Sequence, residues 1–156
     1  MKTVNEPYCF HIFADTAEAG RAADILLREL NARAAAVRTE TREGADIALL
    51  TDPAICRDDD RIEDNDSGIS LIASGIRGHI FAIGMLLRKI EKVDGGVRLE
   101  DISGSYAPDK RIRGHQIGYR TTPNTYDAWS YEDYRRYYLD MMFFGVNTVE
   151  HIPYEK

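Results

Sequence analysis

The sequence predicts an α/β protein, a two-layer α/β sandwich followed by one strand-helix-strand unit. Two segments with the apolar spacing of amphipathic helices are separated by short strand-like runs in the first part of the chain. Residues 104–109 then have the Gly, Ser and Pro content of a linker, and residues 111–152 follow the order strand, helix, strand. We therefore expect an N-terminal α/β domain at residues 1–107 and a second unit at residues 108–156.

The most apolar stretch lies at residues 66–92, and its two halves carry different signals. Residues 69–73 are typical of a short buried strand, whereas Gly75 and Gly78 interrupt the extended pattern. Apolar residues then recur with the spacing of one helix face, at Ile76, Ile80, Ile83, Leu87 and Ile90. Because the opposite face of this helix is apolar as well, we expect the rest of the domain to pack around it.

The remaining elements of the first domain follow from shorter patterns. Asp15, three residues before Glu18, resembles a capping box and precedes helical spacing over residues 16–33. Short alternating or continuous apolar runs predict the other strands. The run at residues 37–43 has the pattern of an exposed edge strand. These strands lie at residues 8–13, 37–43, 45–51 and 97–102.

Residues 57–66 are strongly charged, with the sequence Arg-Asp-Asp-Asp-Arg-Ile-Glu-Asp-Asn-Asp. Their spacing does not fit a calcium-binding EF-hand loop, which needs a Gly at position 6 and a Glu at position 12. Runs of like charge normally stay in water. We therefore expect a solvated, mobile loop between two strands.

The last segment predicts two parallel strands joined by a helix. Residues 111–119 and 146–152 are strand-like, and a polar loop at residues 120–129 precedes the helix. Ser130 has the character of a helix N-cap, and Gly145 lies where a helix C-terminal glycine belongs. A lone unit of this kind leaves both parallel strands with unpaired edges, so we expect it to be a truncated piece of a larger sheet.

Composition and charge argue against several classes of function. A net charge of -6 and an isoelectric point near 5.2 argue against a nucleic-acid partner, and no apolar run is long enough to span a membrane. The N-terminal residues do not have the pattern of a signal peptide, so the compartment stays open; a chain from which such a peptide had been removed would be extracytoplasmic. The four histidines share no metal-ligand spacing, and we expect no metal and no cofactor. Cys9 and Cys56 are expected to be buried free thiols.

The turn at Gly75 and Gly78 leaves a second function open. Backbone N–H groups at a helix N-terminus, with Arg77 and His79 beside them, would hold a phosphate or carboxylate. The dinucleotide-binding fingerprint is incomplete, because only Gly75-x-x-Gly78 is present and the full pattern has three glycines. One possible function is therefore a self-standing α/β binding module for an anionic ligand. The plainer interpretation is a tight turn between strand and helix that binds no ligand.

Two stretches resemble a known family. Residues 72–88, Ile-Ala-Ser-Gly-Ile-Arg-Gly-His-Ile-Phe-Ala-Ile-Gly-Met-Leu-Leu-Arg, resemble the end of the small α/β domain that precedes the catalytic barrel in family 20 β-hexosaminidases and bacterial α-glucuronidases. Arg113-Gly114 and Phe144-Gly145-Val146-Asn147 resemble the start of the (β/α) barrel in hexosaminidase-like glycoside hydrolases.

The resemblance implies the N-terminal, non-catalytic region of a carbohydrate-processing glycoside hydrolase. Its fold would be a hexosaminidase domain 2-like sandwich followed by the first β-α-β unit of a truncated TIM-type barrel. The parent protein would be an enzyme. The fragment alone would be inactive, because glycoside hydrolysis needs two carboxyl groups and the family carries them on a later barrel strand.

The resemblance also places sugar contacts at the C-terminal ends of the two barrel strands. Aromatic planes stack on sugar rings and short polar groups bond sugar hydroxyls, so six residues there are candidates. They are Arg120, Asn124, Tyr126, Trp129, Glu150 and His151. Arg120 lies one position from the register of a sugar-binding Arg in the hexosaminidase pattern, and the Asp and the Ser-Arg-His run of that pattern are absent here. Packing of Tyr126 and Trp129 onto the helix is an equal alternative, and catalytic residues stay unassigned.

Aromatic and methionine side chains crowd the last predicted helix, and we expect them to pack against the sheet and a neighbouring barrel helix. Without the rest of a barrel, such a face and the strand edges beside it would be open, so we expect the fragment to self-associate. The expected partners are therefore a carbohydrate, bound through the complete protein, and a second copy of the fragment. The sugar and its linkage stay open.

Overall fold

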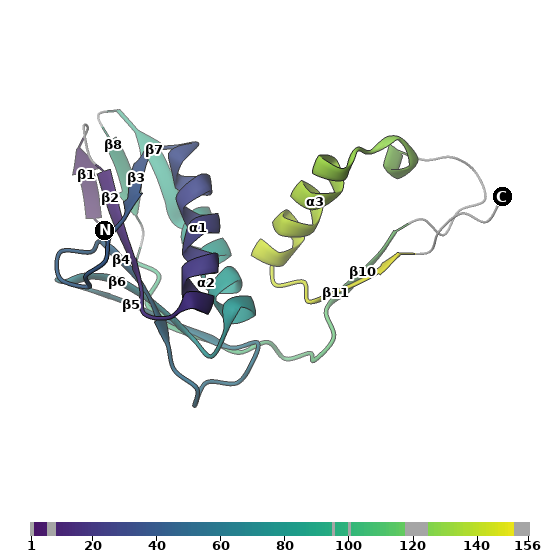
Figure 1. Cartoon of the computed structure of the whole chain (residues 1–156), viewed down its shortest axis with the longest axis horizontal. Helices are drawn as coiled ribbons and strands as arrows, with labels where there is room; N and C mark the ends of the chain where they lie inside the picture. Colours follow the sequence, from purple (N-terminus) through teal and green to yellow (C-terminus); the bar gives the residue numbers. More distant parts are fainter. Residues whose placement is uncertain (1, 6–8, 95, 100, 118–124, 152–156) are drawn as a thin grey trace. The chain divides into compact units, whose positions relative to one another are not determined.

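The computed structural model describes residues 2–5, 9–94, 96–99, 101–117 and 125–151 (Figure 1). The chain divides into two compact units, Met1–Pro108 and Asp109–Lys156, and each is described by itself. Within the described residues, no helix is long and apolar enough to cross a membrane.

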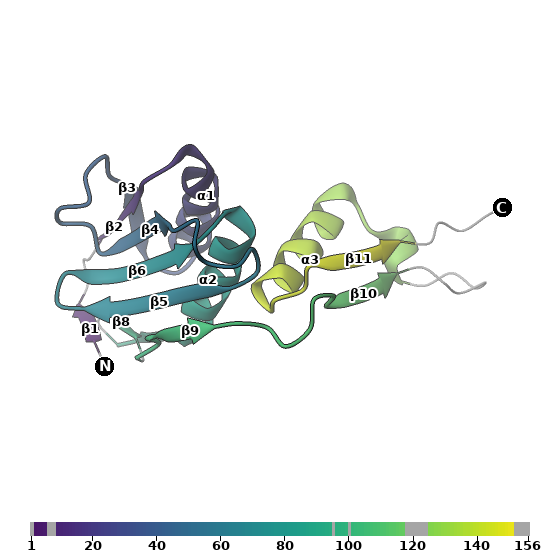
Figure 2. The ribbon, with the colours of Figure 1, turned by 90° about the horizontal axis from the view of Figure 1, so that it is seen from below.

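A six-stranded sheet forms the centre of the first unit. Its strands are β2 (Cys9–Ala14), β3 (Ala35–Arg38), β4 (Ile47–Thr51), β5 (Asp60–Asn65), β6 (Gly68–Ala73) and β9 (Gly104–Tyr106). Across the sheet their order is β3-β2-β4-β6-β5-β9 (Figure 2). Strands β3, β2, β4 and β6 are parallel to one another, and β5 is antiparallel to both of its neighbours, β6 and β9.

Two helices cover one face of this sheet. The first, α1 (Ala17–Asn31), packs against β2, β3 and β4, and the second, α2 (Ile76–Lys89), packs against β5 and β6. The helices also contact each other, so they form a single layer (Figure 2). The first unit is therefore the predicted two-layer α/β sandwich.

Apolar periodicity decides which side chains enter the core. In β2, Phe10 and Ile12 are buried and His11 between them is exposed. The buried side chains of α1 form one stripe, whereas α2 buries most of its surface, as its apolar sequence predicted. The α1 stripe consists of Ala19, Ala22, Ala23, Leu26 and Leu30.

The expectation of a solvated loop at residues 57–66 is wrong for most of that segment. Asp60–Asn65 forms β5, which pairs with β6 on one side and β9 on the other. Ile62 is only 1% exposed, and its charged neighbours Arg61 and Glu63 form an ion pair at 3.0 Å. Alternate residues of a strand point to opposite faces, so a run that is charged on average still buries one side in the core.

Two smaller expectations are also wrong. Residues 104–106 form the edge strand β9 instead of a linker, and the hydroxyl of Tyr106 donates to Ile102 O at 2.8 Å. Both cysteines are free, but Cys9 is only partly buried and Cys56 is exposed, because Cys56 lies in the loop that leads into β5.

A small antiparallel sheet completes the first unit. Its strands are β1 (Lys2–Asn5), β7 (Ile90–Val93) and β8 (Gly96–Leu99), in the order β1-β8-β7. Sequence patterns predicted only the middle strand, β8. Strand β7 continues directly from the end of α2, where the apolar spacing of the helix runs into the first residue of the strand.

The second unit consists of two parallel strands and a helix. The strands are β10 (Gly114–Ile117) and β11 (Thr148–His151), and between them lie a short 3-10 helix, η1 (Thr125–Ala128), and α3 (Tyr131–Phe143). The predicted order strand, helix, strand is confirmed for this unit.

Local sequence signals set both ends of α3. Ser130 Oγ accepts a hydrogen bond from Asp133 N at 3.2 Å, and Asp133 Oδ2 accepts one from Ser130 N at 2.8 Å. The Ser130 hydroxyl also donates to Asp133 Oδ2 at 2.7 Å, and this bond, together with the one from Ser130 N, lowers the pKa of the Asp133 carboxyl because both favour its charged form. At the other end, Gly145 has a φ of 86°, the left-handed conformation that a glycine adopts without strain.

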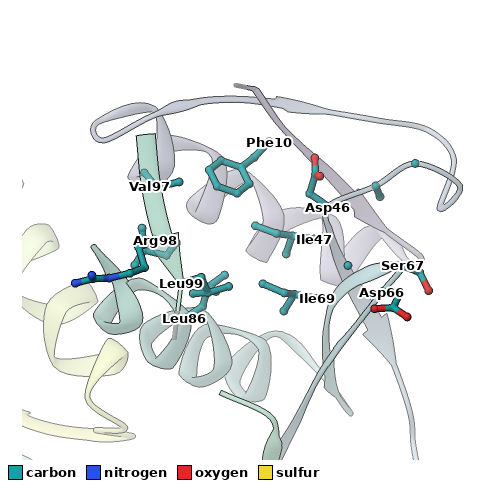
Figure 3. A pocket seen from close by; sticks show the side chains of 14 residues that line it. Phe10, Asp46, Ile47, Asp66, Ser67, Ile69, Leu86, Val97, Arg98 and Leu99 are labelled. Atoms are coloured by element: carbon teal, nitrogen blue, oxygen red, sulfur yellow. The ribbon is translucent and has the colours of Figure 1, made fainter. Parts of the chain in front are cut away.

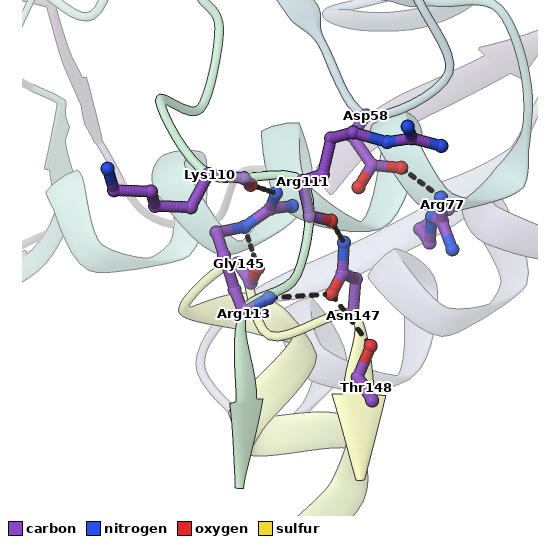
Figure 4. A network of polar contacts seen from close by, with 8 residues as sticks. All are labelled: Asp58, Arg77, Lys110, Arg111, Arg113, Gly145, Asn147 and Thr148. Carbon is purple, nitrogen blue, oxygen red and sulfur yellow. Dashed lines mark hydrogen bonds and ion pairs between the residues drawn. The ribbon is translucent and has the colours of Figure 1, made fainter.

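The side chain of Asn147 joins the starts of β10 and β11 (Figure 4). Its Oδ1 accepts from Arg113 N at 3.0 Å, and its Nδ2 donates to Arg111 O at 2.8 Å. The Arg113 side chain donates to Gly145 O from Nε and to Lys110 O from Nη1, each at 2.7 Å. Because no hairpin turn sets the register of parallel strands, these side-chain bonds hold it here.

Replacing Asn147 by alanine should lower the free energy of unfolding of the second unit by about 1–2 kcal/mol, because the partly buried Arg113 N and the exposed Arg111 O lose their hydrogen-bond partners. The chain has one tryptophan, Trp129, and it lies in this unit, so its fluorescence during urea unfolding measures the loss. The variant Asn147→Asp keeps the acceptor and loses the donor, and its stability should lie between that of the alanine variant and that of the parent chain. An alanine variant as stable as the parent chain would contradict the role given to Asn147.

Candidate functional site

The turn between β6 and α2 was one candidate site, and its helix N-terminus is already occupied. The N–H of Ile76, the first residue of α2, donates to Glu18 Oε1 at 3.1 Å. Glu18 lies in the first turn of α1, so a carboxylate of the chain itself takes the place that an anionic ligand would take.

The side chains beside this turn are occupied as well. The guanidinium of Arg77 forms an ion pair with Asp58 (Figure 4). His79 is 0% exposed, and its Nε2 lies 3.0 Å from Leu50 O. Burial lowers the pKa of the His79 imidazole, because the charged form loses its water.

Gly78 is needed for close packing at this turn. A Cβ on Gly78 would lie 2.8 Å from both Ala73 Cβ and Asp59 O. The glycine therefore lets α2 approach the end of β6, which is the plainer of the two interpretations of this motif. With the Ile76 N–H, the Arg77 guanidinium and His79 Nε2 used inside the domain, the turn does not favour the alternative function as a binding module for an anionic ligand.

The second candidate site lies at the C-terminal ends of β10 and β11. Ile117 pairs with His151 in the parallel register, so the segments that follow both strands begin at the same edge of the sheet. One position earlier, Gln116 Nε2 donates to Glu150 Oε2 at 2.9 Å. Side chains from two strands that are distant in sequence thus meet next to this edge.

The two faces of this small sheet have different neighbours. His115 and Ile117 lie on the face toward α3, since the His115 ring is 5.8 Å from the ring of Tyr137 and Ile117 is 0% exposed. Strand residues alternate between faces, so Gln116 and Glu150 lie on the face turned away from α3. This polar pair therefore does not belong to the packing of the helix on the sheet.

The predicted aromatic contacts form a cluster with α3. Tyr126 and Trp129 have their ring centroids 4.7 Å apart, and Trp129 lies 5.3 Å from Tyr134 and 4.9 Å from Tyr137. The hydroxyl of Tyr134 donates to Tyr126 O at 2.7 Å. Burial raises the pKa of Tyr137 in this cluster. Tyr126 and Trp129 thus attach η1 to the helix, and both remain only partly buried.

The structure describes the side chains of only three of the six predicted sugar contacts, Tyr126, Trp129 and Glu150. Arg120 and Asn124 lie outside the described residues, and so does the side chain of His151. Among the others, Glu150 lies at the strand end and the two aromatic residues lie in the segment that leads into α3. Gln116 was missed by the sequence reasoning, although strand alternation alone would have placed it on the same face as Glu150 once the register was known.

In the part of the chain that the structure describes, no group of three or more His, Cys, Asp or Glu side chains is arranged to hold a metal ion.

The two units together have a glycoside-hydrolase-like fold. No family model matches the chain, and no curated protein sequence matches it. Among solved structures, an inactive mutant of the GH20 exo-β-N-acetylglucosaminidase from Vibrio harveyi matches with a TM-score of 0.78. The identity is 18%, over 96% of this chain and 22% of that chain.

Two further solved structures are similar to the chain over most of its length. The β-N-acetylhexosaminidase from Bacteroides fragilis matches with a TM-score of 0.74 and 14% identity, over 96% of this chain and 30% of that one. A family GH115 4-O-methyl-α-glucuronidase with specificity for decorated arabinogalactans matches with a TM-score of 0.67 and 13% identity, over 96% and 25%. The chain thus spans less than a third of the length of each structure, and the predicted resemblance is confirmed for the fold.

Proposed function

We propose that this chain is the N-terminal, non-catalytic region of a carbohydrate-processing glycoside hydrolase. The observation that carries the proposal is the likeness of 96% of the chain, sandwich and β-α-β unit in one order, to GH20 and GH115 enzymes. In this proposal residues 1–107 are the accessory domain. Residues 108–156 are the first β-α-β unit of a (β/α) barrel.

Further strand-helix units would complete the barrel. Among the described residues, β10 and β11 pair only with each other, whereas parallel sheets normally extend further and are buried on both faces. Hydrolysis of a glycosidic bond needs two carboxyl groups that flank it, and we assign them to later strands. The 156-residue chain is then inactive by itself.

The same proposal explains the apolar surface of the second unit. Tyr131 is 76% exposed and Phe144 is 73% exposed, although both are large apolar residues. The remaining barrel would cover such groups and the open strand edges. In its absence the isolated chain would self-associate through them.

The barrel also gives a role to the polar pair at the strand ends. In a (β/α) barrel the helices lie outside, so side chains turned away from them point inward, and substrates bind at the C-terminal ends of the strands. Glu150 and Gln116 meet both conditions. We therefore propose Glu150 as a sugar contact, with Tyr126 and Trp129 as stacking surfaces and Arg120, Asn124 and His151 as further candidates.

Activity of the natural gene product tests the proposal. An antibody against the 156-residue chain would isolate that product from the cells that make it, and a panel of aryl glycosides would assay it. We expect a chain several times heavier than 17.7 kDa that hydrolyses at least one glycoside, with no turnover by the 156-residue chain. A natural product of 17.7 kDa without glycosidase activity would overturn the proposal.

The proposed role of Glu150 has its own test in that product. Glu150→Gln should raise KM for the hydrolysed glycoside by roughly tenfold, because a charged hydrogen bond to a sugar hydroxyl becomes a neutral one. Glu132→Gln, an exposed position in the first turn of α3, is the matched control and should leave KM unchanged. Equal KM values for the two variants would exclude Glu150 from the sugar site.

A further inference from the structure

A cavity of about 330 Å³ lies inside the first unit, and no residue of the Gly75–Gly78 turn lines it (Figure 3). It lies between the six-stranded sheet, the last turns of α2 and strand β8. Its walls are apolar, and several of them belong to the core, since Ile47 is 1% exposed and Leu86 is 0% exposed. The apolar walls are formed mainly by Phe10, Ile47, Ile69, Leu86, Val97 and Leu99.

The arrangement of the two sheets explains why this space is not filled. Among the described residues, strand β8 pairs with β1 and β7 and not with the six-stranded sheet, and its side chains Val97 and Leu99 line the cavity opposite Ile47 and Ile69. Gly68 shapes the side of the cavity at the turn between β5 and β6. Its φ is 120°, and a Cβ there would lie 2.7 Å from Asp46 O and 2.9 Å from Ala45 O. The turn therefore lies directly against the segment that leads into β4.

One side of the cavity is acidic. Asp46, Asp66 and Ser67 line it on the side of these two segments (Figure 3). Asp46 Oδ2 already accepts from His11 N at 2.8 Å, whereas among the described residues nothing pairs with the carboxylate of Asp66. On the other side, the lining residue Arg98 donates from Nε to Glu91 Oε2 at 3.1 Å, so a local carboxylate offsets its positive charge.

We infer that this cavity binds a small amphiphilic amine, with an aromatic or branched aliphatic body in the apolar space and an ammonium group at Asp66. The volume suits such a body, because a cavity of roughly 150 Å³ already accepts benzene and small-molecule sites begin at about 300 Å³. Desolvation of the apolar body drives binding. The unpaired carboxylate selects a cation over a neutral or anionic ligand of the same shape. The inference is independent of the proposed function.

Three indole probes of different charge test this assignment. Tryptamine, indole and indole-3-acetate share one ring system, and titration calorimetry measures their binding to the 156-residue chain. We expect saturable binding with the affinity order tryptamine, indole, indole-3-acetate, and a negative heat-capacity change for tryptamine. Asp66→Asn should bring the affinity for tryptamine down to that for indole and leave the affinity for indole unchanged.

A matched pair of variants ties the binding to the cavity. Leu99→Phe adds volume inside it and should weaken tryptamine binding by roughly tenfold or more, because the added ring occupies the space of the ligand. Val37→Phe adds a ring on the exposed edge strand β3, where Val37 is 43% exposed, and should leave binding unchanged. Circular dichroism establishes that each variant is folded, and Ile90→Phe, at another wall position, replaces Leu99→Phe if that variant does not fold.

Three results would overturn the inference. One is the absence of saturable tryptamine binding by the parent chain. Another is unchanged tryptamine binding by the folded cavity-filling variant. Equal affinities for the three probes would refute the assignment to an amine.

Discussion

Gly68→Ala should destabilise the first unit by about 3 kcal/mol or more, since it combines backbone strain with a steric clash. Gly68 has a φ of 120°, where L side chains are rarely found. Its Cβ would lie 2.7 Å from Asp46 O, and this oxygen is held in place because it accepts a hydrogen bond from Ile69 N at 2.8 Å. Circular dichroism during urea unfolding measures the effect on the sandwich.

Gly44 provides the matched control for this prediction. It also has a positive φ, 77°, but a Cβ there would meet nothing within 4 Å. Gly44→Ala should therefore cost only the strain of the backbone, about 1 kcal/mol. If the two alanine variants lose the same stability, the close contact between the β5–β6 turn and the start of β4 does not have the importance given to it here.

Asp60→Asn should raise the free energy of unfolding at pH 8 by about 2–4 kcal/mol, because a buried charge is removed. Asp60 is 6% exposed, and burial, together with the neighbouring Asp59 charge, raises its pKa from 3.8 to about 7; the charge of Arg88 offsets only part of this. One of its carboxylate oxygens, Oδ2, is buried without a hydrogen-bond partner.

The sign of the pH dependence follows from that pKa. An acid whose pKa is raised in the folded state binds a proton more tightly there than in the unfolded chain. Its contribution to stability is therefore fully present below pH 3.8 and is lost as the pH rises to about 7. The gain in the free energy of unfolding from Asp60→Asn should thus be absent below pH 3.8. It should grow as the pH rises from 3.8 to about 7 and stay constant above that.

Urea unfolding at a series of pH values measures this difference. Glu63→Gln is the control, because Glu63 lies in the same strand and is exposed. It should change stability little at any pH, since exposed ion pairs contribute at most about 1 kcal/mol. An Asp60→Asn variant whose stability follows the parent at every pH would show that Asp60 is not strained by its burial.

Local patterns in the sequence were sufficient to predict the helices and the central strands. The capping residues of α3 and the apolar face of α2 lie within a few residues of the structure they form, so spacing alone predicts them. Strand β5 was missed because its average charge hides the alternation around Ile62. Strand β9 was missed because β5 is its one strand partner among the described residues, so its pairing depends on a neighbour that is distant in sequence.

The candidate sites were harder to predict, because their decisive contacts are long-range. Glu18 occupies the start of α2 from a position 58 residues away in the chain. Sequence reasoning named the glycines of that turn, but it had no means of placing this carboxylate beside them. In the same way, the contact of Gln116 with Glu150 joins residues 34 positions apart and depends on a strand register that no local motif reveals.

We propose that β10 and β11 are the first two strands of a closed parallel barrel. Amide hydrogen exchange along β11 (Thr148–His151) tests it most directly, when the natural gene product is compared with the 156-residue chain. A third parallel strand would pair with the edge of β11 that has no strand partner among the described residues, so exchange there should be slower in the natural product by roughly tenfold or more. Equal exchange rates at β11 in the two proteins would contradict the account.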